Sequence, residues 1–311
     1  MSEILQVAAL YRSQLGSQGL RTLADFFAYN QGDRLDKPGL ETWRQRWRIT
    51  VPAVPGGDDA DTDTNAGRPK MSTFYLKRFS RPPLRRQWQR WLSGSWWTST
   101  AGVEWANAVD LAAAGVRAVQ PVAFGEEMVG PWERRSFILL GQAPGESLEQ
   151  WVPRHLPAVS TEPGRVSIER DGVSAERDGF NRRHRLDALA RFIGKFHAAG
   201  FVHRDLYLCH IFYMERLSAD SSSRHEFCLI DLQRVFRPRW WRMQRWVVKD
   251  LAALAYSTPT DRVGLWERLR FLCRYVQVCS GRFGSARQLA ALVHAKTASI
   301  ARQRQRRLAR Q

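Results

Sequence analysis

The sequence predicts an α+β fold of two lobes, with strands concentrated before Leu140 and helices after it. In the first part of the chain, apolar residues gather in short runs rich in β-branched and aromatic side chains, which is typical of strands. From Leu186 onward they recur at the spacing of one helical face. A polar and charged stretch over 153–183 is predicted to be a surface insertion. We therefore expect an N-terminal lobe over 1–140 and a helical C-terminal lobe over 141–311.

The elements of the first lobe follow one another at short intervals. β-branched and aromatic runs predict strands at 47–54, 72–79, 120–124 and 136–140. Helical spacing predicts a short helix at 84–92 and a longer, Ala-rich helix at 100–114. The polar segment 56–68 has no apolar period, so it is predicted to be a loop between the first two strands.

The second lobe is predicted to be mostly helical. Its first helix carries apolar residues at helical spacing and ends at Gly200, the apolar positions being Leu186, Leu189, Ala190, Ile193 and Phe196. Further helical patterns cover 249–256, 263–278 and 289–302. Two short apolar runs, 201–202 and 227–230, each end just before a group of polar residues that carries the candidate chemistry.

The charge of the chain indicates anionic partners. Its 311 residues include 48 Lys and Arg against 30 Asp and Glu, a formal net charge of +18. Such a surplus favours nucleic acid, an anionic membrane surface or a phosphorylated substrate as partner. The segment 281–311 holds eight basic residues and no acid, so it is either a basic binding tail or the solvated end of a helix. The sequence has no run of about 18 apolar residues, so no membrane-spanning helix is predicted. Its four cysteines lack C-x-x-C spacing and are predicted to be reduced thiols in a cytoplasmic protein.

The strongest chemical signal lies where the helix over 186–200 ends. After the turn at Gly200, a short apolar stretch leads directly into His203, Arg204 and Asp205. This order of helix, turn and polar triplet matches the H-R-D catalytic loop of protein kinases. In that loop the aspartate accepts or orients the proton of the acceptor hydroxyl. The alternative is a surface loop in which the triplet occurs by chance.

Two further positions predict a nucleotide and a metal site. Asp231 ends an apolar run, which is where a kinase places the carboxylate that binds Mg²⁺. Lys77 lies in a predicted strand and is predicted to hold nucleotide phosphates. Glu104, the first acidic residue after it, is predicted to be the nucleotide-site carboxylate that fixes the position of the lysine. Considered alone, Asp231 could cap a turn and Lys77 could be an ordinary surface lysine. No G-x-G-x-x-G precedes Lys77, and a phosphate-binding turn could fall in 30–39 or in 56–68.

Three motifs of this sequence resemble the motifs of one protein family, the bacterial lipopolysaccharide core heptose and Kdo kinases. They are His203-Arg-Asp-Leu-Tyr-Leu-Cys-His-Ile-Phe212, Asp231-Leu-Gln-Arg-Val235 and Lys249-Asp-Leu-Ala-Ala-Leu-Ala-Tyr-Ser257. The resemblance covers roughly 47–275. The sequence departs from the family pattern at Gln233, where the family has histidine, and in the insertion over 153–183.

The resemblance implies a bilobal protein-kinase-like fold that transfers the γ-phosphate of ATP to a sugar hydroxyl of the lipopolysaccharide inner core, on a heptose or on Kdo. By motif position, the family's nucleotide, base and metal roles pass to Lys77, Glu104, Asp205, His210 and Asp231, with His210 standing where protein kinases have a metal-binding Asn. Asp250 is similar to the helical aspartate that supports the catalytic loop. ATP and Mg²⁺ are the implied cofactors, and a lipid-linked glycan is the implied acceptor.

Tryptophan and basic residues coincide in two stretches without acids, 81–101 and 237–249, which hold seven of the 13 tryptophans. Amphipathic rings and basic side chains suit an anionic membrane surface, so we expect a protein peripheral to the inner face of the cytoplasmic membrane. The alternative is that these tryptophans pack the lobes while arginines extend around them.

Two other hypotheses are compatible with the whole sequence. The protein could be a protein or small-molecule kinase, or it could be a pseudokinase or basic scaffold without catalysis. The set of Lys77, Asp205 and Asp231 argues against the scaffold, because a binding module has no need of two convergent carboxylates near a lysine. His210 favours it, since imidazole is a poor ligand for Mg²⁺. The family resemblance, however, makes a histidine expected at this position. The scaffold that would bind nucleic acid is therefore not the favoured interpretation, and nucleic acid is not the expected partner.

Overall fold

The computed structural model describes residues 2–35, 41–52, 71–92, 94–158, 172–217 and 223–309. It divides into two compact units. The N-terminal unit comprises Met1–Ala113 and Ala118–Gln142, and the C-terminal unit comprises Ala114–Arg117 and Ala143–Gln311. The predicted loop over 56–68, and residues 159–171 of the predicted insertion, lie outside the described residues.

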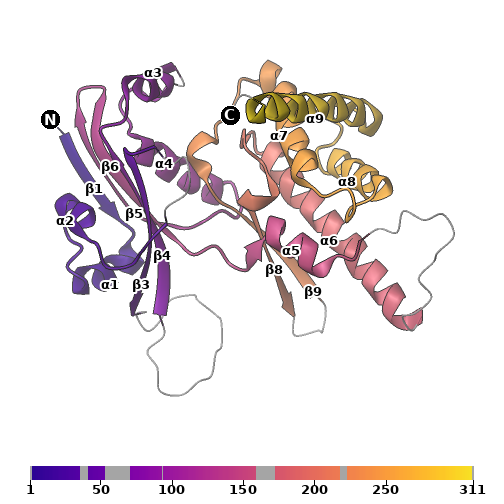
Figure 1. The fold of residues 1–311 in the computed structure, drawn as a ribbon, viewed down its shortest axis with the longest axis horizontal. Coiled ribbons are helices and arrows are strands. Elements are labelled where there is room, and N and C mark those ends of the chain that lie inside the picture. The colour runs from indigo at the N-terminus through magenta and orange to yellow at the C-terminus, as the bar shows by residue number, and fades with distance from the viewer. Residues whose placement is uncertain are drawn as a thin grey trace. The chain divides into compact units, whose positions relative to one another are not determined.

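The N-terminal unit is built on an antiparallel six-stranded sheet with the order β1-β5-β6-β4-β3-β2 (Figure 1). The strands are β1 (Ser2–Val7), β2 (Asp33–Arg34), β3 (Arg44–Pro52), β4 (Met71–Ser80), β5 (Pro121–Val129) and β6 (Trp132–Gly141). The four predicted strands are therefore confirmed as β3 to β6, each with somewhat different bounds. β1 and the two-residue β2 were not predicted.

The described part of this unit also contains the α-helices α1 (Arg12–Ser17), α2 (Leu23–Ala28), α3 (Leu84–Leu92) and α4 (Thr100–Ala113). The predicted helices at 84–92 and 100–114 are confirmed as α3 and α4. The helix α2 buries Phe26, whose ring stacks on Phe137 of β6 with centroids 4.1 Å apart. Leu76 and Leu139, neighbours on β4 and β6, are buried in the same core. Because Leu76 is buried in this core, its sequence neighbours on β4 point to the opposite face of the sheet.

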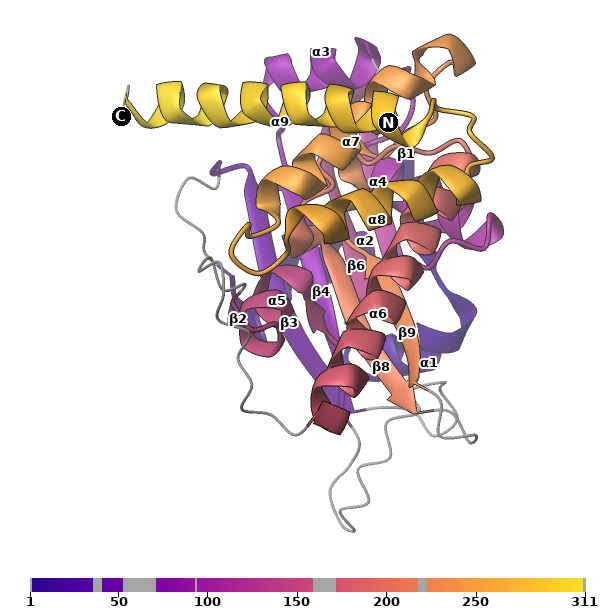
Figure 2. The same cartoon turned by 90° about the vertical axis from the view of Figure 1, so that its right-hand side faces the viewer.

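The C-terminal unit is mostly helical, as predicted, so the α+β class is confirmed (Figure 2). Its helices are α5 (Leu148–His155), α6 (Gly172–Ala198), α7 (Met243–Ser257), α8 (Leu265–Val278) and α9 (Ala286–Leu308). The helix α6 packs on α8, and α7 packs on α9. The basic segment predicted as a tail or helix end is helical as far as Leu308.

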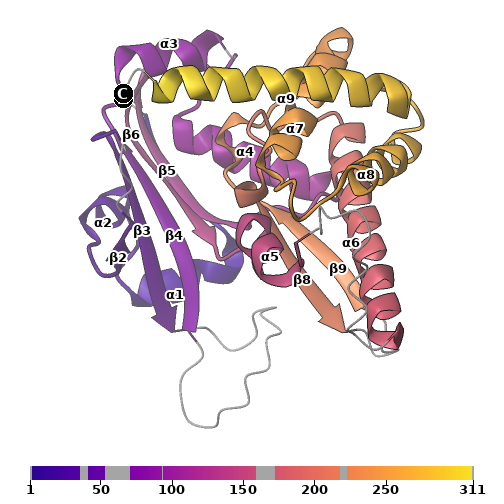
Figure 3. The same cartoon turned by 45° about the vertical axis from the view of Figure 1, so that its right-hand side comes forward.

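A small sheet of order β7-β8-β9 lies beside α6 (Figure 3). Its strands are β7 (Glu146–Ser147), β8 (Ile211–Leu217) and β9 (Ser223–Leu229). The apolar run at 227–230 is the end of β9, whereas β8 was not predicted. At 201–202 there is only an isolated bridge between Val202 and Phe236.

The predicted insertion differs from the structure at both ends. The helix α5 continues through Pro153 to His155, and α6 begins at Gly172. The part of 153–183 from Gly172 onward is therefore helical. Its sequence lacks the apolar period from which helices were predicted, so it was assigned to the insertion.

Candidate catalytic site

The N-terminal unit holds a buried ion pair between Lys77 and Glu104. The Lys77 Nζ lies 2.6 Å from Glu104 Oε1, and the two side chains are 11% and 0% exposed. Alternation along β4 explains the position of the lysine, since Phe74 and Leu76 point into the core and Lys77 points to the opposite face. The structure thus brings together the two residues that the sequence assigned to the nucleotide.

Two buried carboxylates hold the start of the helix that carries Glu104. The backbone N–H and the hydroxyl of Thr100 both donate to Glu133 Oε2 at 2.8 Å, and the N–H of Ser99 donates to Glu126 Oε2 at 2.9 Å. Burial raises the pKa of Glu133. Acceptors at a helix start satisfy N–H groups that have no intrahelical partner, so α4 and Glu104 are fixed relative to the sheet.

In the C-terminal unit, Asp250 of α7 fixes the loop that contains Asp205. Its Oδ2 accepts the backbone N–H of His203 at 2.6 Å, and its Oδ1 accepts the backbone N–H of Arg204 at 2.7 Å. Asp250 is fully buried. Arg204 has a positive φ of 70°, a conformation that is rare for arginine and that two charge-assisted hydrogen bonds can stabilise.

A second group of buried residues supports Asp250 from the side of α6 and α8. His197 Nε2 donates to Asp250 Oδ2 at 3.4 Å, and its Nδ1 lies 2.8 Å from the hydroxyl of Tyr275. Burial raises the pKa of Tyr275 well above its ordinary value, so the phenol stays neutral and donates to the imidazole. The contact between His197 and Tyr275 was not predicted, because the two residues lie 78 positions apart in the sequence.

His203 links this loop to the segment that carries Asp231. The His203 Nε2 donates to the carbonyl of Ile230 at 3.0 Å. Burial lowers the pKa of His203, so its ring is neutral near pH 7. Since Ile230 immediately precedes Asp231, this hydrogen bond fixes the turn at which that carboxylate leaves β9.

His210 lies against both Asp205 and Asp231. Its Nδ1 donates to the backbone carbonyl of Asp205 at 2.7 Å, and its Nε2 lies 3.8 Å from Asp231 Oδ2. Asp231 has a left-handed backbone with φ of 57°. Unusual backbone conformations in non-glycine residues concentrate at functional sites. The structure therefore brings Asp205, His210 and Asp231 together within the C-terminal unit.

Arg234 is a site residue to which sequence reasoning gave no role. Its Nη1 contacts both carboxylate oxygens of Asp205, at 2.9 Å and 2.7 Å. The only signal in the sequence was its place three residues after Asp231. The pair leaves Asp205 partly exposed, with 26% of its side chain accessible, so an acceptor can reach the carboxylate.

The donor set at Asp231 fits Mg²⁺ bound together with a nucleotide. Mg²⁺ prefers oxygen ligands and is usually held by one or two carboxylates plus substrate phosphates. Asp231 offers one such carboxylate, while an imidazole such as His210 is a weaker ligand for this ion. Among the described residues, no group of three His, Cys, Asp or Glu could hold a metal by itself.

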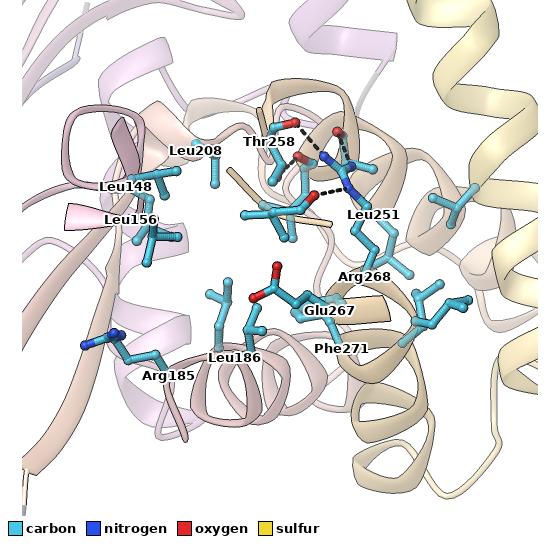
Figure 4. Close-up of a pocket in the computed structure, with 18 of the residues that line it drawn as sticks. Leu148, Leu156, Arg185, Leu186, Leu208, Leu251, Thr258, Glu267, Arg268 and Phe271 are labelled. Carbon is cyan, nitrogen blue, oxygen red and sulfur yellow. Dashed lines mark hydrogen bonds between the residues drawn. The ribbon is translucent and has the colours of Figure 1, made fainter. Parts of the chain in front are cut away.

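Apart from these residues, the C-terminal unit contains an apolar cavity of about 260 Å³ lined by helices α5 to α9 (Figure 4). Leu148, Leu186 and Leu208 line it, and the charged groups of Glu267 and Arg268 at its wall have protein partners. Arg268 donates to the carbonyls of Ala255, Thr258 and Val263 at 3.0, 2.7 and 3.1 Å. The cavity is thus apolar in chemistry.

Comparisons with known proteins agree with these features. The model of the lipopolysaccharide kinase (Kdo/WaaP) family matches residues 64–270. The chain is 32% identical over 177 residues to the lipopolysaccharide core heptose(I) kinase WaaP of Pseudomonas aeruginosa, covering 55% of this chain and 58% of that protein. It is 31% identical over 167 residues to the protein of the same name from Escherichia coli, covering 53% and 55%. The chain thus matches a little more than half the length of these curated relatives.

A solved structure confirms the kinase-like fold. The structure of WaaP in complex with acyl carrier protein superimposes with a TM-score of 0.59 at 22% sequence identity, covering 96% of this chain and 99% of that chain. The described part of the chain contains no helix with the length and hydropathy needed to cross a membrane.

Proposed function

This chain belongs to the lipopolysaccharide kinase (Kdo/WaaP) family, and from that premise we propose that it transfers the γ-phosphoryl group of ATP to a sugar hydroxyl of the lipopolysaccharide inner core. The observation that carries the proposal is that His210 lies against both Asp205 and Asp231, while the buried Asp250 holds the loop that carries Asp205. Carboxylates whose segments are fixed by buried hydrogen bonds suit phosphoryl transfer, which depends on positioning and charge stabilisation.

In this proposal Asp205 orients the acceptor hydroxyl and takes its proton as the bond to phosphorus forms. His203 and Arg204 hold the loop through the hydrogen bonds that their backbones donate to Asp250. Asp231, with His210 beside it, would hold Mg²⁺, which neutralises phosphate charge when it is bound with the nucleotide.

Lys77 is the residue that we propose binds the nucleotide phosphates. The buried pair with Glu104 holds its ammonium at the end of a constrained side chain rather than leaving it free in solvent. An ion pair of this kind, between a strand lysine and a helix glutamate, must be in place for phosphate binding in protein kinases. ATP is accordingly the proposed phosphate donor.

The acceptor that we favour is a heptose. The relatives compared above carry the name heptose(I) kinase, whereas Kdo enters only through the family name. Kdo, a protein and a small-molecule acceptor remain outcomes of the test below.

The experiment that tests this function is transfer of labelled γ-phosphate from ATP to extracted inner-core glycolipid in the presence of Mg²⁺. We expect label on a heptose of the glycolipid and no transfer when EDTA removes the metal. Label on Kdo would change the acceptor, and no label on any glycolipid would overturn the proposed function.

We also propose that the protein binds the anionic surface on which its acceptor resides. In the C-terminal unit, Trp240 and Trp241 are 79% and 56% exposed, and exposed arginines flank them in the sequence at 237, 239, 242 and 245. In the N-terminal unit, Trp88 and Trp97 are also exposed, at 57% and 75%. In contrast, Trp91 is buried and donates to the carbonyl of Pro131, so packing explains only part of the tryptophan pattern.

Vesicle flotation tests this surface. We expect the double substitution Trp240→Ala/Trp241→Ala to weaken binding to phosphatidylglycerol vesicles by about tenfold or more. The variant lacks two large apolar side chains that would be buried at the membrane–water interface. The matched control is Trp266→Ala, which removes a tryptophan that is 82% exposed on α8. Equal flotation of the double variant and wild type, or equal binding to neutral vesicles, would contradict the proposal.

The apolar cavity favours a second proposal, that the C-terminal unit binds the acyl chain of an acyl carrier protein. The related WaaP structure is a complex with such a carrier. The cavity suits a hydrocarbon chain, because the charged groups at its wall are hydrogen-bonded within the protein. Arg268 donates to main-chain carbonyls, and Glu267 accepts from Arg182 and from the N–H of Gly264. An apolar cavity of this kind also offers water few hydrogen-bond partners.

Filling the cavity should remove this binding. We expect a long-chain acyl carrier protein to raise the Tm of wild type by several degrees, and the Leu186→Trp variant to lose that shift, since a bound ligand stabilises the folded state. Leu292→Trp is the control, because Leu292 is 45% exposed on α9 and does not line the cavity. An equal shift with carrier lacking an acyl chain would contradict the proposal.

A further inference from the structure

Three cations lie near one another in the C-terminal unit, and one of them contacts the Asp205 carboxylate. Arg234 contacts both carboxylate oxygens. The guanidinium of Arg204, the neighbouring residue, lies 5.3 Å from the ring centroid of Trp246. The ammonium of Lys249 lies 5.2 Å from the same centroid. Arg204 and Lys249 thus share one indole ring, and Arg204 directly precedes the residue that Arg234 contacts.

The backbone explains how these distant residues meet. Val202 and Phe236 exchange two main-chain hydrogen bonds, with N···O distances of 3.0 and 3.1 Å. This bridge sets the segment after Arg234 against the start of the catalytic loop. The guanidinium of Arg204 also lies 5.6 Å from the ring centroid of Phe236. The cluster is therefore built on two segments that pair through their main chains, with Trp246 and Lys249 supplied by α7.

The acids near this cluster do not balance its charge. Asp250 directs its two oxygens at the backbone N–H groups of His203 and Arg204, and Asp205 is paired with Arg234. Burial and then the charges of Arg234 and Arg204 lower the pKa of Lys249. Burial and then Arg234 lower the pKa of Arg204. Like charges held together at reduced solvent access attract an anion, because an anion relieves their mutual repulsion.

We propose that Lys249, Arg204 and Arg234 bind a negatively charged substituent of the acceptor glycolipid, a sugar carboxylate or a phosphate, beside the hydroxyl that Asp205 orients. This inference rests on the proposed function and names the chemistry by which that site selects its acceptor. Guanidinium and ammonium groups are the side chains that recognise carboxylates and phosphates most strongly.

The cluster lies on the acceptor side of Asp205 rather than on the nucleotide side. His210 donates to the backbone carbonyl of Asp205 and faces Asp231, so that direction belongs to the metal and nucleotide. Arg234 contacts instead the Asp205 carboxylate itself, where the acceptor hydroxyl must lie. An anion bound there would fix the orientation of the sugar, and a neutral sugar would lack this anchor.

Lys249→Gln tests the site through binding measured without ATP, so that turnover is not needed. The probes are detergent-dispersed inner-core glycolipid in native, carboxyl-methylated and dephosphorylated forms. We expect wild type to bind one modified form about tenfold or more weakly, in line with the loss of a charge-assisted hydrogen bond. That form identifies the anion as carboxylate or phosphate.

The Lys249→Gln variant should bind the native glycolipid as weakly as wild type binds the modified form. It should bind the modified form little more weakly still, because the substitution and the modification of the glycolipid remove the same interaction. Lys249→Arg should restore most of the binding, and Lys296→Gln, at an exposed position of α9, should bind as wild type. Equal binding of all three glycolipids by wild type would overturn the inference. A similar loss with every form in Lys249→Gln would also overturn it.

Kinetics separate this inference from the proposed function. We expect Lys249→Gln to raise the acceptor KM with little change in the ATP KM. A rise confined to the ATP KM would overturn the inference and assign the cluster to the nucleotide. Charge-dependent glycolipid binding without any phosphate transfer would overturn the proposed function and leave the anion site standing, whereas no binding of native glycolipid by wild type would overturn both.

Discussion

The substitution Asp205→Asn is expected to lower kcat by about 10²- to 10⁴-fold, which is the range that a positioned general base contributes. The amide has nearly the same volume as the carboxylate but cannot take the proton of the acceptor hydroxyl. The backbone carbonyl of Asp205 still accepts from His210, and the loop is still held by Asp250. We therefore expect the fold and the KM for ATP to change little. Glycolipid-stimulated release of ADP measures the effect.

The control for this prediction is Asp187→Asn, on α6. Asp187 pairs with Arg270 on the surface, and exposed pairs of this kind contribute little to stability or function. Wild-type turnover is expected for the control. A loss of less than about tenfold in Asp205→Asn would show that another group takes the proton.

The substitution Asp250→Ala should have the largest effect on stability. It removes a fully buried carboxylate that accepts from the backbones of His203 and Arg204 and from His197. The remaining donors stay buried without a partner, so we expect the free energy of unfolding to fall by about 3–5 kcal/mol. Turnover should fall with it, because the loop that carries Asp205 loses its support. Urea-induced unfolding followed by tryptophan fluorescence measures the change.

The Asp250→Asn variant makes this prediction specific. Its amide keeps one oxygen that can accept a backbone N–H, so its loss of stability should lie between that of wild type and that of Asp250→Ala. Equal stability of all three proteins would mean that the loop is held by other contacts, such as the hydrogen bond from His203 to Ile230.

The residues of the site that lie close together in sequence could be predicted from it. The helix that ends at Gly200 and the apolar run before His203 are local patterns, and α6 ends at Ala198 as the turn requires. Lys77 could be assigned because alternation on β4 is a property of a single strand. Asp250 came from the family resemblance, and its hydrogen bonds to His203 and Arg204 give that assignment a physical reason.

Contacts that depend on how distant segments meet could not be predicted. The pairing of Arg234 with Asp205 depends on the left-handed turn at Asp231, which sends the next residues back toward the catalytic loop. The position of Lys249 near Arg204 depends on the packing of Trp246. Composition and periodicity contain neither piece of information.

The same reason applies to the fold. β1 pairs with β5, more than 100 residues away along the chain, and its burial is incomplete, so its own sequence gives a weak strand pattern. The helical start of α6 lacks an apolar period and was therefore read as part of an insertion. The apolar cavity is formed by five helices together, and no single one of them indicates it.

The measurement that tests the central claim most directly is the location of labelled phosphate after wild type, Asp205→Asn and Asp231→Asn are each incubated with labelled ATP, Mg²⁺ and extracted inner-core glycolipid. We predict label on a core sugar with wild type, and almost none with either variant, although both variants should unfold at temperatures near that of wild type. Label transferred equally by wild type and Asp205→Asn, or label found only on protein, would contradict the account.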